Sequence, residues 1–224
     1  MSAAEVRATR ERLGLTQQQA ARRWKVSQAY LSLMEHGKRP VPDRLARRVA
    51  RAEPRMATAL SPDAFPGRSD DLPRLLGSLG YGGFAYLAEA RAVMNPAAGV
   101  LAALRTPGVP ARVTEALPWV LVTFAHLDWD WLVDQAKLAN LQNRLGYLVT
   151  LGRTVAERQG DAGAAQALTD AEHRLEEARL AREDTLGREL TEAERRHLRE
   201  HRPPAAAHWN LLTSLRAEDL RYAR

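Results

Sequence analysis

The stretch Leu13–Pro42, LGLTQQQAARRWKVSQAYLSLMEHGKRPVP, decides the fold of the first part of this chain. Thr16 predicts the N-cap of a helix, and Gln19 follows it at the spacing of a capping box. Ser27 predicts the N-cap of a second helix, which ends at Gly37, a residue typical of the position after a helix. Because only two residues separate these helices, the stretch predicts a helix, a tight turn and a helix.

The flanking sequence extends this pattern to four short helices, which we predict at about 4–13, 17–24, 28–36 and 43–52. Their small and apolar residues can fill one small core: Leu13, Leu15, Ala20, Ala21, Trp24, Val26, Leu31 and Met34. Two helices joined by a short turn within a basic segment are the plan of a helix-turn-helix DNA reader. The third predicted helix would then be the one that enters the major groove.

The exposed face of this third helix carries Gln28, Ala29, Tyr30, Ser32 and Leu33. A glutamine side chain can form two hydrogen bonds with adenine, and alanine or tyrosine can contact the methyl group of thymine. These residue types therefore suit contacts with base edges in double-stranded DNA.

The distribution of charge also favours a polyanionic partner for the first part of the chain. Residues 1–56 contain thirteen Lys and Arg against five acidic residues, a net charge of +8, whereas the remaining 168 residues carry −2. Positive charge that is concentrated in one segment indicates contact with phosphates there and a different role for the rest.

Several short elements recur together in this segment: Leu-Gly-Leu-Thr-Gln at 13–17, Ala20-Ala21, Val26-Ser27, Leu31-Ser32, and Glu35-x-Gly37-Lys38-Arg39 followed by proline. With these elements the segment resembles the XRE/lambda-repressor-like helix-turn-helix family. The resemblance covers the N-terminal quarter of the chain and implies an all-α domain that binds a double-stranded DNA operator.

The resemblance also implies a set of DNA-contacting residues: Gln17, Ser27, Gln28, Ala29, Tyr30, Ser32, Lys38 and Arg39. Gln17 would bind a phosphate at the start of the second helix. Lys38 and Arg39 would hold the DNA backbone beyond the third helix, and the residues between them would face the major groove. Arg10 and Glu35 would form a largely buried ion pair between the first and third helices.

The turn departs from the family at Lys25, where the family often has glycine. A lysine in the left-handed backbone conformation costs about 1 kcal/mol relative to a relaxed residue. We therefore expect strain in the turn if the chain adopts that conformation.

The whole chain is predicted to be all-α. We divide it into a helix-turn-helix domain at 1–56, a linker at 57–71, a helical core domain at 72–160 and a Glu/Arg-rich helical region at 161–224. Proline, glycine and serine mark the linker. Apolar residues beyond it recur at helical spacing, and no stretch alternates as a strand would.

The strongest apolar pattern runs from Trp129 to Leu148 on two faces, which predicts a central, buried helix. Asp128 is expected to cap its start, and the polar run Gln142–Arg144 inside it is expected to have a structural role. Long helices are predicted at 162–186 and 205–222, with a capped helix from Thr191 between them.

Two functions remain open for residues 72–224. In the first, the chain is an autoregulating repressor or antitoxin whose helical body forms a homodimer and binds a toxin protein, because XRE-like domains often occur in antitoxins. A narrow apolar stripe could pair helices in such a dimer: Leu168, Ala171, Leu175 and Ala178. In the second, the body is a sensor domain, and a small-molecule ligand moves the two DNA-reading domains.

A metal-dependent hydrolase is a remote alternative, because His197, Glu200 and His201 match the H-x-x-E-H pattern of a zinc protease class. The match lies in a run of arginines and glutamates, where such spacings arise by chance, and the neighbouring arginines oppose a cation. The sequence has no phosphate loop, dinucleotide fingerprint or nucleophile elbow. We therefore expect a protein that is not an enzyme and that holds no metal or cofactor.

The absence of cysteine excludes disulfides, iron–sulfur clusters, thiolate zinc sites and cysteine nucleophiles. The first fifteen residues lack the apolar stretch of a secretory signal, and no apolar run approaches the roughly 18 residues of a membrane helix. The sequence therefore predicts a soluble, cytoplasmic protein without a membrane partner.

Overall fold

The computed structural model describes residues 2–12, 15–52, 71–88 and 94–220. The chain separates into two compact units, Met1–Ala59 (unit 1) and Leu60–Arg224 (unit 2), and each is described by itself. The linker predicted at 57–71 lies outside the described residues except for Asp71. Within the described ranges, no helix is long and apolar enough to cross a membrane.

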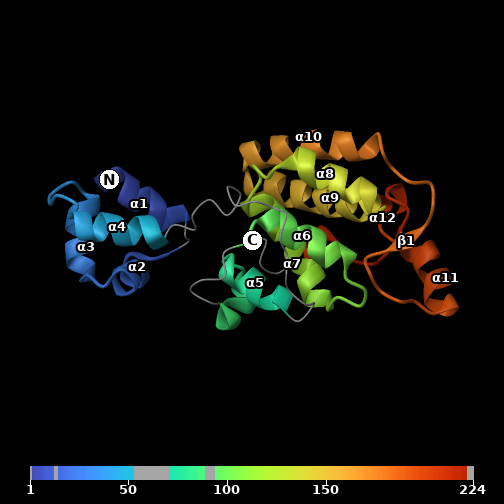
Figure 1. Ribbon diagram of the computed structural model, residues 1–224, viewed down its shortest axis with the longest axis horizontal. Coiled ribbons are helices and arrows are strands. Elements are labelled where there is room, and N and C mark those ends of the chain that lie inside the picture. The colour runs from blue at the N-terminus through green and yellow to red at the C-terminus, as the bar shows by residue number, and fades with distance from the viewer. Residues whose placement is uncertain (1, 13–14, 53–70, 89–93, 221–224) are drawn as a thin grey trace. The chain divides into compact units, whose positions relative to one another are not determined.

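The described residues of unit 1 form four short helices: α1 (Ala3–Arg12), α2 (Gln17–Trp24), α3 (Gln28–Glu35) and α4 (Asp43–Ala52) (Figure 1). The four helices predicted from the sequence are thus confirmed, with ends that differ by at most one residue. Their buried side chains form one core: Val6, Ala20, Ala21, Trp24, Leu31, Met34, Leu45 and Val49. Helix α2 packs against α3 and α4, and its small residues Ala20 and Ala21 are buried in this core.

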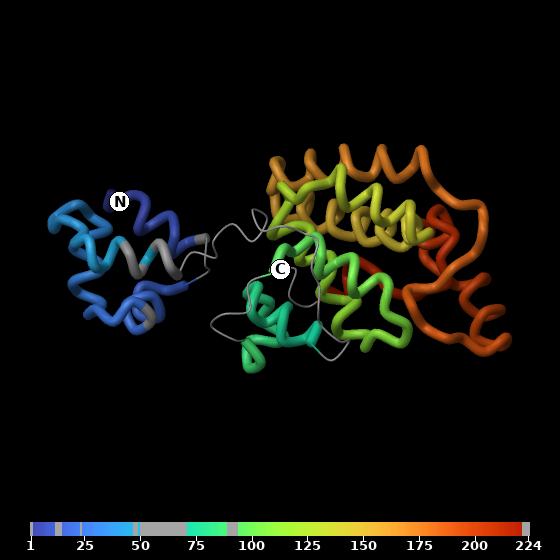
Figure 2. Tube along the Cα trace, in the orientation of Figure 1, coloured from blue at the N-terminus to red at the C-terminus, as the bar shows by residue number. Residues whose placement is uncertain are grey.

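Unit 2 is also mostly helical. Its elements are α5 (Leu72–Ser78), η3 (Gly82–Leu87), α6 (Pro96–Arg105), α7 (Ala111–Thr123), α8 (Trp129–Leu138), α9 (Gln142–Gln159), α10 (Ala162–Glu176), β1 (Asp184–Thr185), α11 (Glu192–His201), α12 (Pro204–His208), β2 (Leu211–Leu212) and η4 (Ala217–Asp219). The tube in Figure 2 shows α8, α9 and α10 as neighbours, with α9 in contact with α7, α8, α10 and α12. The all-α prediction is confirmed, and one core joins side chains from Leu72 to Leu220.

The central helix predicted from Trp129 to Leu148 is two helices, α8 and α9, so that prediction was wrong. Asn140 adopts a left-handed conformation with φ of 56° and ends α8. Asparagine tolerates this conformation better than most residues, so it makes a tight corner between two apolar helices. As a consequence Leu138 points away from the core and is 77% exposed.

The prediction of long helices at 162–186 and 205–222 was also wrong. Helix α10 ends at Glu176, and β1 pairs with β2 in a short parallel ladder. The reason is tertiary: the carbonyl oxygen of Ala178 accepts from Gln142 Nε2 at 3.1 Å, and that of Leu180 accepts from Asn143 Nδ2 at 2.9 Å. Backbone groups of this segment therefore bind side chains at the start of α9, and a sequence rich in helix formers leaves the helix.

The apolar stripe Leu168, Ala171 and Leu175 is buried inside unit 2, where α10 packs along α9. It therefore joins two helices of the same chain and is not available to a second copy. The charged residues of the segment that follows α10 also bind within unit 2, since Arg144 forms two hydrogen bonds with Asp184, both of 2.8 Å.

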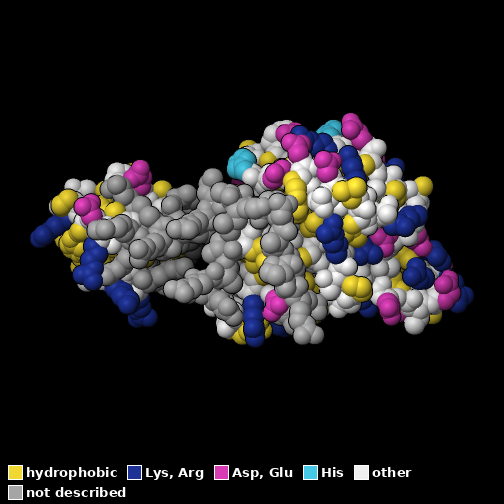
Figure 3. All heavy atoms as spheres, in the orientation of Figure 1, with side chains coloured by type: hydrophobic (Ala, Val, Ile, Leu, Met, Phe, Trp, Pro, Cys, Tyr) yellow, Lys and Arg dark blue, Asp and Glu magenta, His cyan; other side chains and the backbone are white. Residues whose placement is uncertain are grey.

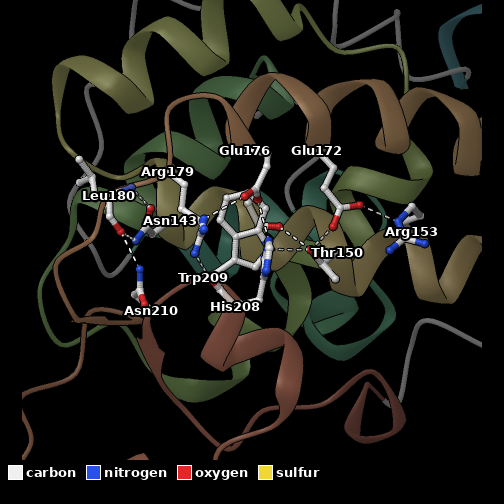
Figure 4. A network of polar contacts seen from close by, with 11 residues as sticks. Asn143, Thr150, Arg153, Glu172, Glu176, Arg179, Leu180, His208, Trp209 and Asn210 are labelled. Atoms are coloured by element: carbon white, nitrogen blue, oxygen red, sulfur yellow. Dashed lines mark hydrogen bonds and ion pairs between the residues drawn. The ribbon is translucent and has the colours of Figure 1, made fainter.

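The segment around α12 is attached to α9 through a polar network (Figure 4). Trp209 Nε1 donates to Thr150 Oγ1 at 2.8 Å, and the same hydroxyl contacts the Glu172 carboxylate, which also accepts from Arg153. Next to it, His208 pairs with Glu176. These contacts join α9, α10 and α12 into one body.

Candidate nucleic-acid interface

Helices α2 and α3 begin at the caps that the sequence predicts. Thr16 Oγ1 accepts from the Gln19 backbone N–H at 3.2 Å, and Gln19 Oε1 accepts from the Thr16 backbone N–H at 2.8 Å. Ser27 Oγ accepts from the Tyr30 backbone N–H at 3.2 Å. These bonds satisfy backbone donors that a helix start leaves free, and they fix where α3 begins relative to α2.

The turn between these helices passes through Lys25, whose φ of 55° and ψ of 50° are left-handed. The backbone N–H of Val26 donates to the Ala21 carbonyl at 3.0 Å and closes the turn. The lysine therefore holds the conformation that the family usually gives to glycine, and the strain described above applies to it.

Arg10 and Glu35 form the ion pair between α1 and α3. Arg10 Nε donates to Glu35 Oε1 at 2.7 Å and Nη2 donates to Oε2 at 3.1 Å, with side-chain exposures of 13% and 2%. A third arginine nitrogen donates to the Leu15 carbonyl at 3.1 Å. The hydrogen bond with Glu35 is the largest cause that raises the pKa of Arg10 above its usual value.

The same carboxylate also binds Gln17, a contact that sequence analysis did not predict. Gln17 Nε2 donates to Glu35 Oε2 at 2.9 Å. The side chain at the start of α2 is therefore held by the buried pair, while one amide hydrogen and the carbonyl oxygen of Gln17 can still take other partners. The spacing of residues in the sequence does not indicate this bond. It joins Gln17 of α2 to a carboxylate of α3 that also binds Arg10 of α1, so it depends on how the three helices pack.

Helix α3 separates into a buried and an exposed side. Leu31, Met34 and Glu35 are buried, whereas Gln28 and Ala29 are exposed. Ser27 is exposed as well, Ser32 is half-buried, and Tyr30 is half-buried because it packs against the core of unit 1. Leu33 is 39% exposed and follows Ala29 by one helical turn; the sequence placed it on the exposed face of this helix, although not among the residues that the resemblance assigns to DNA contact.

Lys38 and Arg39 follow α3 directly and are exposed. Gly37 has a φ of 69°, and its backbone N–H donates to the Met34 carbonyl at 2.9 Å. The N–H of Lys38 donates to the Leu33 carbonyl at 2.8 Å. These bonds attach the backbone of Gly37 and Lys38 to the last turn of α3, and Arg39 follows directly.

Comparison with protein families gives one match. Residues 3–52 match the model described as a helix-turn-helix domain, of the XRE/Cro-like type. The N-terminal quarter is therefore a helix-turn-helix domain. Searches of curated proteins and of solved structures find no match to the chain. The helix-turn-helix domain supports a role as a DNA-binding transcriptional regulator.

The surfaces of the two units differ in charge. Beyond α3, the helix-turn-helix domain exposes Lys25, Arg22 and Arg44 in addition to Lys38 and Arg39. On the face of unit 2 drawn in Figure 3, acidic and basic side chains are interspersed. The mixed surface of unit 2 attracts a polyanion less than a surface of one sign.

The H-x-x-E-H motif lies on α11 of unit 2. The rings of His197 and His201 stack with their centroids 4.3 Å apart, and His201 Nδ1 lies 2.8 Å from the His197 carbonyl oxygen. Among the described residues, no group of three or more His, Cys, Asp or Glu side chains is arranged to hold a metal ion.

A hollow of about 370 Å³ lies between the start of α8 and α10. Asp128 caps α8, since its Oδ1 accepts from the Trp131 backbone N–H at 3.0 Å. Arg174 pairs with Asp130 across the hollow. The remaining lining comes from these residues: Ala125, His126, Leu127, Trp129, Ala167, Asp170 and Ala171.

Proposed function

We propose that this protein is a transcriptional repressor that binds a DNA operator through α3. The observation that carries the proposal is the pair α2 and α3, with Gln28, Ala29 and Ser32 on the outer side of α3 and Lys38 and Arg39 beside it. In this proposal Ser27, Gln28, Ala29, Tyr30 and Ser32 lie toward the major groove. Gln17, Lys38 and Arg39 bind phosphates.

The proposal includes a homodimer. One recognition helix contacts only a few base pairs, and two half-sites about one helical turn apart supply the specificity that a regulator needs. The buried stripe of α10 does not serve as the dimer contact, so the interface is assigned to other surfaces of the chain.

For unit 2 we propose binding of a partner protein, as in an antitoxin that represses its own operon. The family resemblance supports this role, and so does α11, a ten-residue helix without a buried residue, whose surface is accessible to another protein. The proposal assigns the chain no catalytic reaction and no cofactor.

A mobility-shift assay on the DNA upstream of the chain's own gene tests operator binding. We expect a complex that is stronger than with a scrambled duplex and that weakens steeply with salt, because phosphate contacts release counterions. The variant Lys38→Ala should reduce the slope of log affinity against log salt concentration by about 1, because one phosphate contact is lost. The variant Lys137→Ala, which changes an exposed lysine of unit 2, should leave this slope unchanged. Equal affinity for both duplexes would rule out specific operator binding.

Co-expression with the product of the adjacent gene tests the partner. A stable complex that relieves toxicity is expected for an antitoxin. Failure of the two proteins to co-purify would remove the antitoxin role and leave operator binding untouched.

The hollow beside α8 favours a second candidate, a ligand-responsive regulator, because it is large enough for a small molecule and is lined by Trp129 and charged groups. A ligand that enters it should raise the melting temperature of the protein by mass action. The variant Ala167→Leu, which fills part of the hollow, should remove that shift. A shift that persists in this variant would place the ligand elsewhere.

A further inference from the structure

We propose that α3 reads A·T base pairs, with adenine bound by Gln28 and thymine methyl groups in contact with Ala29 and Leu33. The inference rests on the proposed operator binding and names the bases that the operator presents. Three observations support it: the residues on the outer arc of α3, the absence of accessible charge on this helix, and the exposure of Leu33.

The outer arc of α3 follows from helix geometry. At 3.6 residues per turn, Gln28, Ala29, Ser32, Leu33 and the following His36 fall within an arc of about 140°. Leu31 and Met34 lie outside this arc and are buried, and Glu35, two turns after Gln28 at the border of the arc, is buried as well. An element that enters the major groove with this arc foremost presents glutamine, alanine, serine and leucine to the base edges.

Helix α3, which the structure describes completely, has no accessible charged side chain. Its single charged residue is Glu35, which is buried and accepts hydrogen bonds from Arg10 and Gln17. In the major groove, guanine is read chiefly by arginine or lysine and cytosine by glutamate or aspartate. The helix therefore lacks the side chains that select G·C pairs.

His36 follows α3 on the same arc, but its Nδ1 lies 2.7 Å from the Ser32 carbonyl oxygen. This bond ties the imidazole to the end of the helix. Ser32 can bond to any base and does not discriminate, so Gln28 is the polar side chain that selects a base, and the base that suits its two-bond geometry is adenine.

Leu33 is proposed to contact the thymine methyl groups. It is 39% exposed, and it is the large hydrophobic side chain that the described part of unit 1 leaves in solvent. A thymine methyl group is the apolar feature of the major groove, and it offers Leu33 and Ala29 a surface to bury. Leu33 and Ala29 lie one helical turn apart at one edge of the arc and Gln28 lies at the other edge, so the arc as a whole matches an adenine with thymines near it.

Selection of the full-length protein on random-sequence duplexes tests the assignment. We expect half-sites whose conserved core consists of A·T pairs. Replacement of the contacted thymine by uracil, which removes only the methyl group, should weaken binding about fourfold. The variant Leu33→Ala should bind the thymine and uracil sites almost equally.

Leu138→Ala is the matched control, because Leu138 is an exposed leucine of unit 2 and should retain the full response to uracil. Melting curves check that both variants fold. Two results would overturn the A·T assignment but not operator binding. The first is the selection of half-sites whose core consists of G·C pairs. The second is a loss of affinity on uracil substitution that is the same for Leu33→Ala as for the wild-type protein. Selection of no sequence at all would overturn operator binding, and the assignment with it.

Discussion

The indole ring of Trp209 lies directly against the backbone of α9 at Gly146. A Cβ atom at position 146 would lie 2.4 Å from Cζ3 of the ring, a separation at which one of the two groups has to move. The ring is completely buried and its Nε1 is bonded to Thr150, one turn further along α9. Glycine at position 146 is therefore required for α12 to pack on α9.

Gly146→Ala should destabilise unit 2 by roughly 2 kcal/mol, since a methyl group without space forces a shift of buried neighbours. Denaturant unfolding followed by circular dichroism measures the change. Gly152→Ala in the same helix is the control: its Cβ would have ordinary contacts of 3.4 Å or more, and alanine favours the helix. Equal effects of the two variants would contradict the close approach of Trp209.

Lys25→Gly should stabilise the helix-turn-helix domain by about 1 kcal/mol, because glycine adopts the left-handed conformation of the turn without strain. The midpoint of thermal unfolding of the domain is the measurement. Lys25→Ala removes the same charge and keeps the strain, so it should give no comparable gain. A similar gain in both variants would assign the effect to charge.

The ion pair of Arg144 and Asp184 should make unit 2 sensitive to acid. Burial raises the pKa of Asp184, but hydrogen bonds from Arg144 and the Thr185 backbone outweigh it, and the net pKa lies below the usual 3.8. As the pH falls, the unfolded chain takes up this proton before the folded chain does. The contribution to stability is therefore complete above the unfolded pKa and is lost as the pH falls through the folded value.

Asp184→Asn should accordingly flatten the dependence of the unfolding free energy on pH below about 4. Urea unfolding at a series of pH values measures this slope. Asp170→Asn, which changes an exposed aspartate of α10, should keep the wild-type slope. A slope that Asp184→Asn leaves intact would show that other carboxylates govern acid unfolding.

Gln28→Ala should weaken binding to the selected operator by roughly 1–3 kcal/mol and relax the preference at one base pair. Titrations against the operator and against single-base variants measure both effects. Lys38→Ala provides the contrast, because loss of a phosphate contact lowers the affinity for all sequences alike. If Gln28→Ala still distinguished the operator from its single-base variants as well as the wild-type protein does, α3 would not be the helix that reads the bases.

The helix-turn-helix domain could be predicted closely because its signals are local. Caps at Thr16 and Ser27 define helix starts within a few residues, and the apolar positions between them agree with the same four helices. The exposed or half-buried positions of the predicted contact residues on α3 follow from that pattern. The bond from Gln17 to Glu35 does not, because it depends on how three helices meet.

Unit 2 shows where local signals fail. The segment after Glu176 consists of good helix formers, but Gln142, Asn143 and Asn210 bind its backbone carbonyls from other parts of the chain. Such bonds between distant residues leave no trace in sequence spacing. Gly146, a glycine inside an apolar helix, was the one available sign that a large side chain packs closely there.

The location of Trp209, Leu211 and Leu220 in the core of unit 2 has a consequence during translation. Among the described residues, the core of unit 1 is complete once Val49 has been made, and this unit can fold while the ribosome is still translating unit 2. Unit 2 cannot complete its core until Trp209, Leu211 and Leu220 have been synthesised. A nonsense mutation between α10 and β2 would therefore yield a complete helix-turn-helix domain attached to a unit 2 that lacks part of its core.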